Sequence, residues 1–287
     1  MNRKDFIKKS VMGAAAVGVP LAAVSKSQNH NTTSQVGYEH ITKNESLTNN
    51  MKTIFHKATE RGHANHGWLN AHHSFSFANY YNPDKMNFGV LRVLNDDIIA
   101  PGMGFGKHPH DNMEIVTIPL RGDLEHKDSM GNTSVIKHMD VQIMSAGTGI
   151  FHSEYNKNTD KDINLLQIWV FPKQHNITPR YDQKTYLPQD RINKFQTIVS
   201  PEDDGSVWIN QDAWFQLGIF EASKNINYKI NKPGNGVYAF VIDGQVQINN
   251  QTLGKRDALG IYDTTHFEMQ FLTKTEILLI EVPMNIS

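Results

Sequence analysis

The sequence of 287 residues contains no cysteine. This absence excludes disulfide bonds, thiolate metal ligands, zinc knuckles and cysteine nucleophiles, so histidine and carboxylate side chains must carry any metal chemistry. An excess of charge of one sign is also lacking, because 28 basic and 29 acidic residues give a formal net charge of -1. Non-specific nucleic-acid binding requires a broad positive field. We therefore expect no nucleic-acid partner.

Long apolar runs are scarce as well. The N-terminal segment MNRKDFIKKSVMGAAAVGVPLAAVSKS has a basic head, an apolar run from Val11 to Val24 and then small residues, which is the layout of an export signal. The run is short for a membrane span, so we expect no integral span in the mature chain. The stretch RKDFIKK resembles a twin-arginine signal with Lys4 in place of the second arginine. We predict an export signal over residues 1–25, a periplasmic location, and a polar disordered spacer over residues 26–51.

Short apolar runs separated by Gly, Asn and Asp dominate the sequence beyond residue 51. Examples are FGVLRVL, IVTIPLRGD, INLLQIWVF, VYAFVIDGQVQI and TEILLIEV. Many short strands with turn signals between them predict an all-β fold of the sandwich or barrel type. The segment 172–195 is polar and contains prolines, and we interpret it as the connection between two β domains.

An internal repeat favours this division. The run IVTIPLRGDLEH followed by DVQIMSAGTG has the same order of features as YAFVIDGQVQIN followed by DALGIYDTTH. Each copy offers a strand, a glycine turn at Gly122 or Gly244, another strand, and an aspartate that opens a further strand. The pattern predicts a duplicated β unit.

Two histidine couplets indicate a metal site. In GFGKHPHDNMEIV, His108 and His110 face the same side of a strand, and Glu114 does too if the strand continues unbroken. In GTGIFHSEYN, His152 and Glu154 are again two residues apart. Convergence of the couplets inside a barrel would give three imidazoles and one carboxylate, a set that suits divalent Fe, Mn, Ni, Cu or Zn and leaves open positions for catalysis. Spacing alone does not decide between Glu114 and Glu154 as the carboxylate.

The spacing around these couplets resembles the two cupin motifs. The first run, from Gly102 to Gly122, reads glycine, five residues, His-Pro-His, three residues, glutamate and a closing glycine, with a last interval one residue longer than usual. The second run, from Gly149 to Asn156, has glycine, two residues, histidine, three residues and asparagine, and Gly147 stands where proline is usual. Two motifs in order on predicted strands indicate a cupin barrel.

Longer stretches resemble the pirin family. They are RGHANHGWLNAHHSFSFANYYNPDKMNFGVLRVLNDD, HPHDNMEIVTIPLRGDLEHKDSMGN, QIMSAGTGIFHSEYN and QIWVFPKQHNITPRYDQ. The resemblance is dense from residue 52 to about 185 and loose beyond, and within the family it is strongest to bacterial proteins with quercetinase activity. It implies two cupin barrels packed in one chain: a metal-binding domain over 52–182 and a domain over 183–287 that lacks the full ligand set.

The same resemblance implies the ligand set His108, His110, His152 and Glu154. It favours Glu154 over Glu114, which we interpret as a carboxylate that orients a ligand histidine. The implied cofactor is one divalent transition metal ion, with iron expected ahead of Mn, Ni, Cu, Co or Zn. The implied reaction is the quercetin 2,3-dioxygenase type, in which O2 opens the central ring of a small planar polyphenol or enol, with Glu154 as the base that takes the hydroxyl proton.

Other histidines receive plainer interpretations. For His126 we favour a hydrogen bond to Asp128 over a place at the pocket rim. The irregularly spaced histidines between residues 63 and 73, with aromatic neighbours, indicate a packed covering segment rather than a second metal site; they are His63, His66, His72 and His73.

The second predicted barrel departs from the motif. We align INKPGNG with HPHDNME, so that both imidazoles and the glutamate are lost. His266 and Glu268 preserve an H-x-E couplet, but two ligands without the H-x-H pair make a poor site. We therefore interpret this half as structural.

Two rival functions remain open. Some pirin relatives are non-enzymatic, metal-dependent redox sensors or regulatory binding partners, although export would disfavour a role in transcription. A stabilising zinc in a structural or carbohydrate-binding cupin would be closed, tetrahedral and inactive. We expect a monomer.

Overall fold

The computed structural model describes residues 51–286. The predicted export signal, residues 1–25, and the predicted spacer, except for Met51, lie outside the described residues. Within 51–286 the regular elements are strands, apart from two short 3-10 helices, η1 (Ala58–Glu60) and η2 (Pro188–Arg191), which confirms the predicted all-β class. Neither of these helices, nor any other stretch of helix over the same residues, has the length and apolar character needed to cross a membrane.

The first barrel is built from one seven-stranded and one four-stranded sheet. The order of the larger sheet is β12 (Arg180–Thr185), β9 (Asp140–Ser145), β6 (Glu114–Arg121), β11 (Ile163–Val170), β4 (Leu91–Ile99), β3 (Leu69–His73) and β2 (Gly62–Asn65). The order of the smaller sheet is β5 (Gly104–His110), β10 (Ile150–Asn156), β7 (Leu124–Asp128) and β8 (Thr133–Ile136).

The second barrel has the same composition of sheets. The order of its larger sheet is β1 (Lys52–His56), β20 (Ala258–Tyr262), β17 (Asn235–Asp243), β22 (Thr275–Pro283), β15 (Trp214–Phe220), β13 (Phe195–Ser200) and β14 (Val207–Trp208). The order of its smaller sheet is β16 (Asn225–Lys229), β21 (His266–Phe271), β18 (Val246–Ile248) and β19 (Gln251–Leu253).

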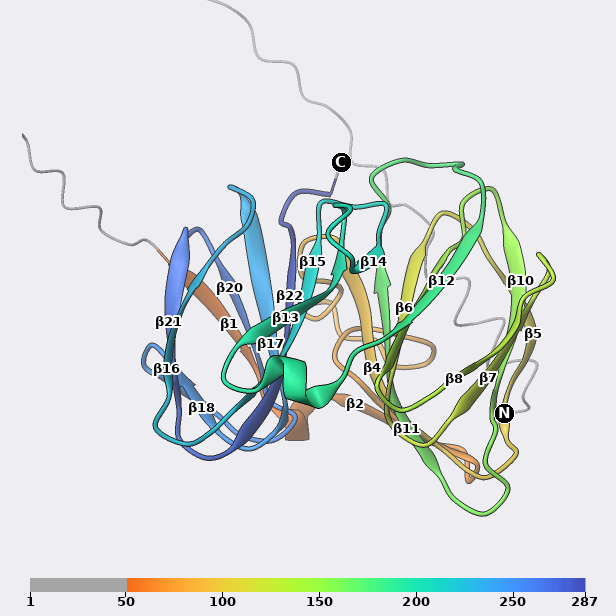
Figure 1. Ribbon diagram of the computed structural model, residues 1–287, viewed down its shortest axis with the longest axis horizontal. Coiled ribbons are helices and arrows are strands. Elements are labelled where there is room, and N and C mark those ends of the chain that lie inside the picture. The colour runs from red at the N-terminus through yellow and green to blue at the C-terminus, as the bar shows by residue number, and fades with distance from the viewer. Residues whose placement is uncertain (1–50, 287) are drawn as a thin grey trace, which may run out of the picture.

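The barrels lie side by side with their seven-stranded sheets facing each other (Figure 1). A hydrophobic cluster between them includes Val116 and Leu166 from the first barrel and Tyr238 and Phe240 from the second. The facing sheets are therefore buried on both sides, which explains near-continuous apolar runs such as INLLQIWV in β11. The outer sheets alternate instead, as in β21, whose residues are exposed and buried in turn.

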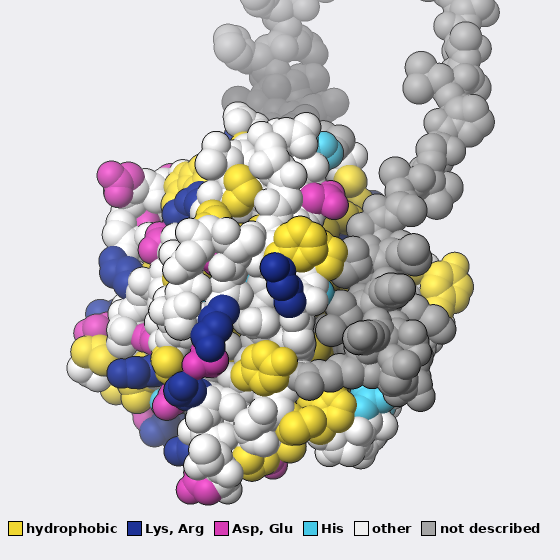
Figure 2. All heavy atoms as spheres, turned by 90° about the vertical axis from the view of Figure 1, so that its right-hand side faces the viewer, with side chains coloured by type: hydrophobic (Ala, Val, Ile, Leu, Met, Phe, Trp, Pro, Cys, Tyr) yellow, Lys and Arg dark blue, Asp and Glu magenta, His cyan; other side chains and the backbone are white. Residues whose placement is uncertain are grey.

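Alternation also separates the surface of the first barrel from its interior. Figure 2 faces the outer side of the β5-β10-β7-β8 sheet, where lysine, acidic and apolar side chains are interspersed over the described surface. Lys107 and Phe151 belong to this outer side, with the ammonium group 5.3 Å from the ring centre. Their neighbours along the strands, His108 and His152, are buried. The outer sheet thus presents its histidines to the barrel interior.

The predicted duplication is confirmed by the topology. The order β9-β6-β11-β4 with β5-β10-β7-β8 in the first barrel matches β20-β17-β22-β15 with β16-β21-β18-β19 in the second. The two turn glycines, Gly122 and Gly244, have φ of 79° and 93°, a left-handed conformation that glycine adopts without steric cost. The same supersecondary unit is therefore used twice.

Two segments cross the predicted domain limits. β1, at the start of the predicted first domain, pairs with β20 in the second barrel. The segment 172–195, interpreted as a connection, contains β12, which pairs with β9, so the boundary after residue 182 falls inside a strand. β12 is a half-exposed edge strand. It carries no apolar run that the sequence could reveal.

Candidate metal centre

The predicted ligands lie on two adjacent strands of the first barrel. β5 carries His108 and His110, and β10 carries His152 and Glu154. The strands are antiparallel, with His152 directly opposite His108. Because alternate residues of a strand share a face, each couplet points to one side. All four side chains are buried in the barrel interior.

The three imidazoles form a compact group. Their ring centroids are 4.4 Å apart for His108 and His152 and 4.9 Å apart for the other two pairs. One ring nitrogen from each lies within 4.8 Å of the others. Nδ1 of His108 donates to the Gly106 carbonyl oxygen at 2.8 Å, which leaves its Nε2 lone pair for a ligand. Neutral imidazoles in this arrangement can share one cation.

His152 supplies the test of whether a metal fits. Its side chain is buried, and neither Nδ1 nor Nε2 has a hydrogen-bond partner. Buried polar groups are almost always hydrogen-bonded, so a histidine with both nitrogens unpartnered requires an explanation. A cation held jointly with His108 and His110 provides one, and the nitrogen and carboxylate donors suit a divalent transition metal. The residues therefore fit such an ion.

Burial controls the protonation of these histidines. Burial, with a smaller contribution from neighbouring His108, lowers the pKa of His110 to about 3. Burial also lowers the pKa of His108 and, strongly, that of His152, on which His108 and His110 act in the same direction. The imidazoles are therefore neutral near pH 7, the state in which they bind metal ions.

Glu154 lies at the edge of the histidine group. Its carboxylate and one ring nitrogen each of His152 and His126 lie within 4.8 Å of one another. Gln167 Nε2 donates to Glu154 Oε2 at 2.8 Å. Burial raises the pKa of Glu154 to about 7, and the Gln167 hydrogen bond opposes that rise. The group is thus a carboxyl that exchanges its proton near neutral pH in the absence of a cation.

Glu114 points elsewhere. Its Oε2 accepts hydrogen bonds from Ser145 Oγ at 2.8 Å and from the Asn210 backbone N–H at 3.1 Å. Asn210 precedes β15 of the second barrel, so this carboxylate ties the barrels together. The interpretation that Glu114 orients a ligand histidine is wrong. Met113 packs inside the first barrel, and because successive residues of a strand face opposite sides, Glu114 faces the second barrel.

His126 is nearer to the group than we expected. The favoured hydrogen bond is confirmed, with Nε2 3.4 Å from Asp128 Oδ2. His126 is also buried, lies opposite Glu154 in the β7–β10 pairing, and has its ring centre 5.2 Å from that of His152. The signal was present in LEHKD, where alternation puts His126 on the same inward face as Leu124.

The histidines between residues 63 and 73 divide between two faces. His73 is buried and bonds Asn95 through Nδ1 at 2.8 Å, which agrees with a packed segment. His63 stacks on His72 with ring centres 4.6 Å apart and is exposed, whereas His66 is half-buried. None of them belongs to the groups of three metal donors found among the described residues.

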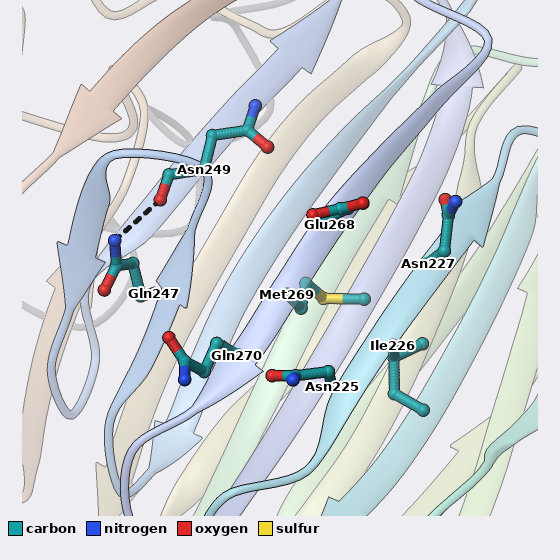
Figure 3. A pocket seen from close by; sticks show the side chains of 8 residues that line it. All are labelled: Asn225, Ile226, Asn227, Gln247, Asn249, Glu268, Met269 and Gln270. Atoms are coloured by element: carbon teal, nitrogen blue, oxygen red, sulfur yellow. Dashed lines mark hydrogen bonds between the residues drawn. The ribbon is translucent and has the colours of Figure 1, made fainter.

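The H-x-E couplet of the second barrel faces outward. His266 and Glu268 are exposed positions of β21. Glu268 lines an open groove of about 490 Å³ on the outer sheet, together with exposed amide side chains of Asn225, Asn227 and Gln270 (Figure 3). The groove is remote in the fold from the histidine group, and its walls are solvated side chains. Neither residue of the couplet can join a site inside the barrel.

Comparisons with known proteins cover both barrels. The Pirin family matches residues 54–170, and the quercetinase C-terminal cupin domain matches residues 197–282. The quercetin 2,3-dioxygenase of Escherichia coli (strain K12) is 43% identical over 229 residues, which cover 79% of this chain and 97% of that protein. The pirin-like protein of Caulobacter vibrioides is 40% identical over 222 residues, which cover 77% of this chain and 95% of that protein.

A solved structure agrees with the sequence relatives. The crystal structure of the bacterial pirin YhhW from Escherichia coli in complex with nickel(II) matches with a TM-score of 0.77 at 42% identity, over 81% of this chain and 99% of that chain. The similarity thus spans the paired barrels and the whole length of that relative. On these matches, and on the duplicated cupin topology, the chain belongs to the pirin family.

Proposed function

We propose that the chain is a metal-dependent dioxygenase of the quercetinase type, which uses O2 to open the ring of flavonols or similar planar enols. The observation that carries the proposal is His152, buried with both ring nitrogens unpartnered beside His108 and His110. A relative named quercetin 2,3-dioxygenase, 43% identical over 229 residues, supports the reaction class.

In this proposal His108, His110, His152 and Glu154 hold one divalent ion. Iron is the proposed native metal, and the nickel(II) complex of YhhW supports nickel as an alternative. When bound, an ion held by three neutral nitrogens and one carboxylate keeps about one positive charge, which lowers the pKa of a coordinated hydroxyl group.

Glu154 is the proposed base. Burial raises the pKa of Glu154 to about 7 when no cation is bound, and a bound cation would lower it, so the carboxylate is ionised and able to accept a proton near neutral pH. Gln167 Nε2 donates to Oε2 and fixes the orientation of the carboxylate. One wall of the interior is apolar: Val93, Ile115 and Trp169 belong to one buried cluster, and the Trp169 ring centre lies 4.9 Å from that of His110. An apolar wall of this kind suits a planar aromatic ligand.

Export completes the proposal. The basic head, apolar run and small residues of the first 25 positions support a periplasmic protein, for which a flavonol from outside the cell would be accessible. A mild formal charge of -1 supports a small-molecule substrate rather than a nucleic acid.

The decisive experiment is oxygen uptake by the metal-loaded protein with a panel of flavonols. We expect Glu154→Gln to lower turnover by about 100-fold or more, because the substituted amide cannot accept the proton. The metal content of each preparation is measured in parallel. Glu268→Gln, an exposed substitution in the other barrel, serves as the matched control and should behave as the wild type.

Two results would contradict the proposal. Undiminished oxygen uptake by Glu154→Gln would exclude Glu154 as the base. A metal-loaded wild-type protein that consumes no oxygen with any flavonol would instead favour the non-enzymatic, metal-dependent sensor or binding protein.

A further inference from the structure

The Asp128 carboxylate fixes the orientation of His126. Its Oδ1 accepts hydrogen bonds from the backbone N–H groups of Met130 and Asn132 at 2.9 and 3.0 Å, and its Oδ2 accepts one from Asn132 Nδ2 at 2.8 Å. His126 Nε2 lies 3.4 Å from the same Oδ2. Because a carboxylate oxygen accepts, Nε2 is the nitrogen that carries the proton.

The other ring nitrogen is left as an acceptor without a donor. In neutral imidazole a protonated Nε2 leaves a lone pair on Nδ1. His126 is only 1% exposed, and its Nδ1 has no hydrogen-bond partner. A buried acceptor without a donor costs free energy relative to one that is hydrogen-bonded. It requires a donor from something that enters the barrel.

The His126 ring lies beside part of the proposed ligand set. His126 shares a group of neighbouring donors with His152 and Glu154, whereas His108 and His110 group with His152 without it. The imidazole therefore lies beside His152 and the Glu154 carboxylate. On its other side the Tyr181 ring packs with a centroid distance of 4.9 Å, while the Tyr181 hydroxyl donates to Gln183 Oε1.

We propose that His126 is a substrate-contacting residue whose Nδ1 accepts a hydrogen bond from a hydroxyl group of the planar phenolic or enolic ligand. This inference rests on the proposed function and deepens it, because it names a residue that selects hydroxylated ligands. The Asp128 carboxylate acts through His126 as a positioning group, since it holds the ring by Nε2 and leaves Nδ1 available to the ligand.

Three substitutions separate this role from metal binding. His126→Asn retains a carbonyl oxygen near the place of Nδ1, His126→Gln moves its polar atoms toward the place of Nε2, and His126→Phe keeps a ring with no acceptor. The dissociation constant of quercetin is measured for each metal-loaded protein without oxygen, from the absorbance change of the flavonol. Metal content and thermal unfolding are measured on the same samples.

We expect the dissociation constant to rise about tenfold in His126→Phe and His126→Gln and to stay within about threefold of the wild type in His126→Asn, with unchanged metal content. Glu268→Gln should match the wild type throughout. If His126→Phe fails to fold, the Asn and Gln variants, both polar and smaller than or similar to histidine, decide the question between them.

The contrary outcomes are distinct. Equal dissociation constants in all variants, with a wild type that binds quercetin, would overturn the role of His126 and leave the proposed function standing. Loss of metal from the variants would make His126 a ligand rather than a substrate contact. A metal-loaded wild type that binds no flavonol would overturn the proposed function and this inference with it.

Discussion

The two barrels place different chemistry at the same positions. His152 lies opposite His108 in the first barrel, and Phe267 lies opposite Tyr228 in the second. Likewise Glu154 lies opposite His126, and Met269 lies opposite Ile248. In the second barrel, the residues that occupy the positions of His108, His110, His126, His152 and Glu154 are Tyr228, Ile230, Ile248, Phe267 and Met269.

The same interior positions therefore form a hydrophobic core in one barrel and a polar site in the other. The five replacements belong to a single hydrophobic cluster inside the second barrel. The one buried carboxylate at its end, Glu281, accepts five hydrogen bonds, whereas Glu154 accepts one from Gln167, and His152 takes part in none. The fold is shared, so function depends on the polar atoms that the protein itself leaves unsatisfied.

The largest effect should come from giving the first barrel a residue of the second. His152→Phe removes the histidine shared by both groups of donors and fills its place with the ring found at Phe267. We expect metal content to fall to background and oxygen uptake with quercetin to fall by more than about 100-fold, a loss beyond that caused by residues that only support a ligand. Elemental analysis and an oxygen electrode measure the two losses.

The reverse substitution is the control. Phe267→His places one imidazole among apolar neighbours and should bind no metal, because Tyr228 and Ile230 offer no partner ligands. Retention of metal by His152→Phe would contradict this contrast between the barrels, since the ion would then be bound by residues other than the three histidines and Glu154.

Substitution of Glu281 should lower the stability of the protein and leave metal binding unchanged. Its Oε1 accepts from Lys232 N–H and Asn235 Nδ2, and its Oε2 accepts from the Tyr228 hydroxyl and from Asn231. Glu281→Leu leaves two backbone N–H groups without these acceptors, at about 1–3 kcal/mol each, so we expect the free energy of unfolding to fall by about 3 kcal/mol or more. Denaturant unfolding measures it.

The metal provides the control for Glu281→Leu. The variant should still load metal in the first barrel to the wild-type ratio wherever it is folded. A loss of metal without a loss of stability would contradict the division of roles between the barrels.

Much of the fold could be predicted because the pattern of apolar runs records burial. Facing sheets require continuous apolar strands, and glycine turns such as Gly122 and Gly244 mark the repeated unit. The sequence did not reveal the edge strands β1 and β12, because they are partly exposed and carry no apolar run. Their pairing with strands distant in sequence is a tertiary effect, which local patterns do not contain.

The candidate site could be predicted only as far as strand alternation reaches. Alternation gave the inward faces of the couplets at His108 and His152, but it could not say which strands lie side by side. The alignment of INKPGNG with HPHDNME was wrong by two residues, since register puts Tyr228 at the position of His108. The same register turns His266 outward, at the position of Phe151.

The smallest expected effect concerns Glu114, the carboxylate of the first cupin motif. Its Oε2 accepts from Ser145 Oγ and Asn210 N–H, and both bonds survive in Glu114→Gln, because the amide oxygen still accepts. We expect unchanged metal content and turnover and a loss of about 1 kcal/mol or less in the free energy of unfolding, from the lost negative charge. Glu154→Gln, measured beside it, should lose turnover by about 100-fold. If Glu114→Gln instead released the metal while Glu154→Gln retained it, the ligand carboxylate would belong to β6, and the contrast between an interior site and an inter-barrel tie would be reversed.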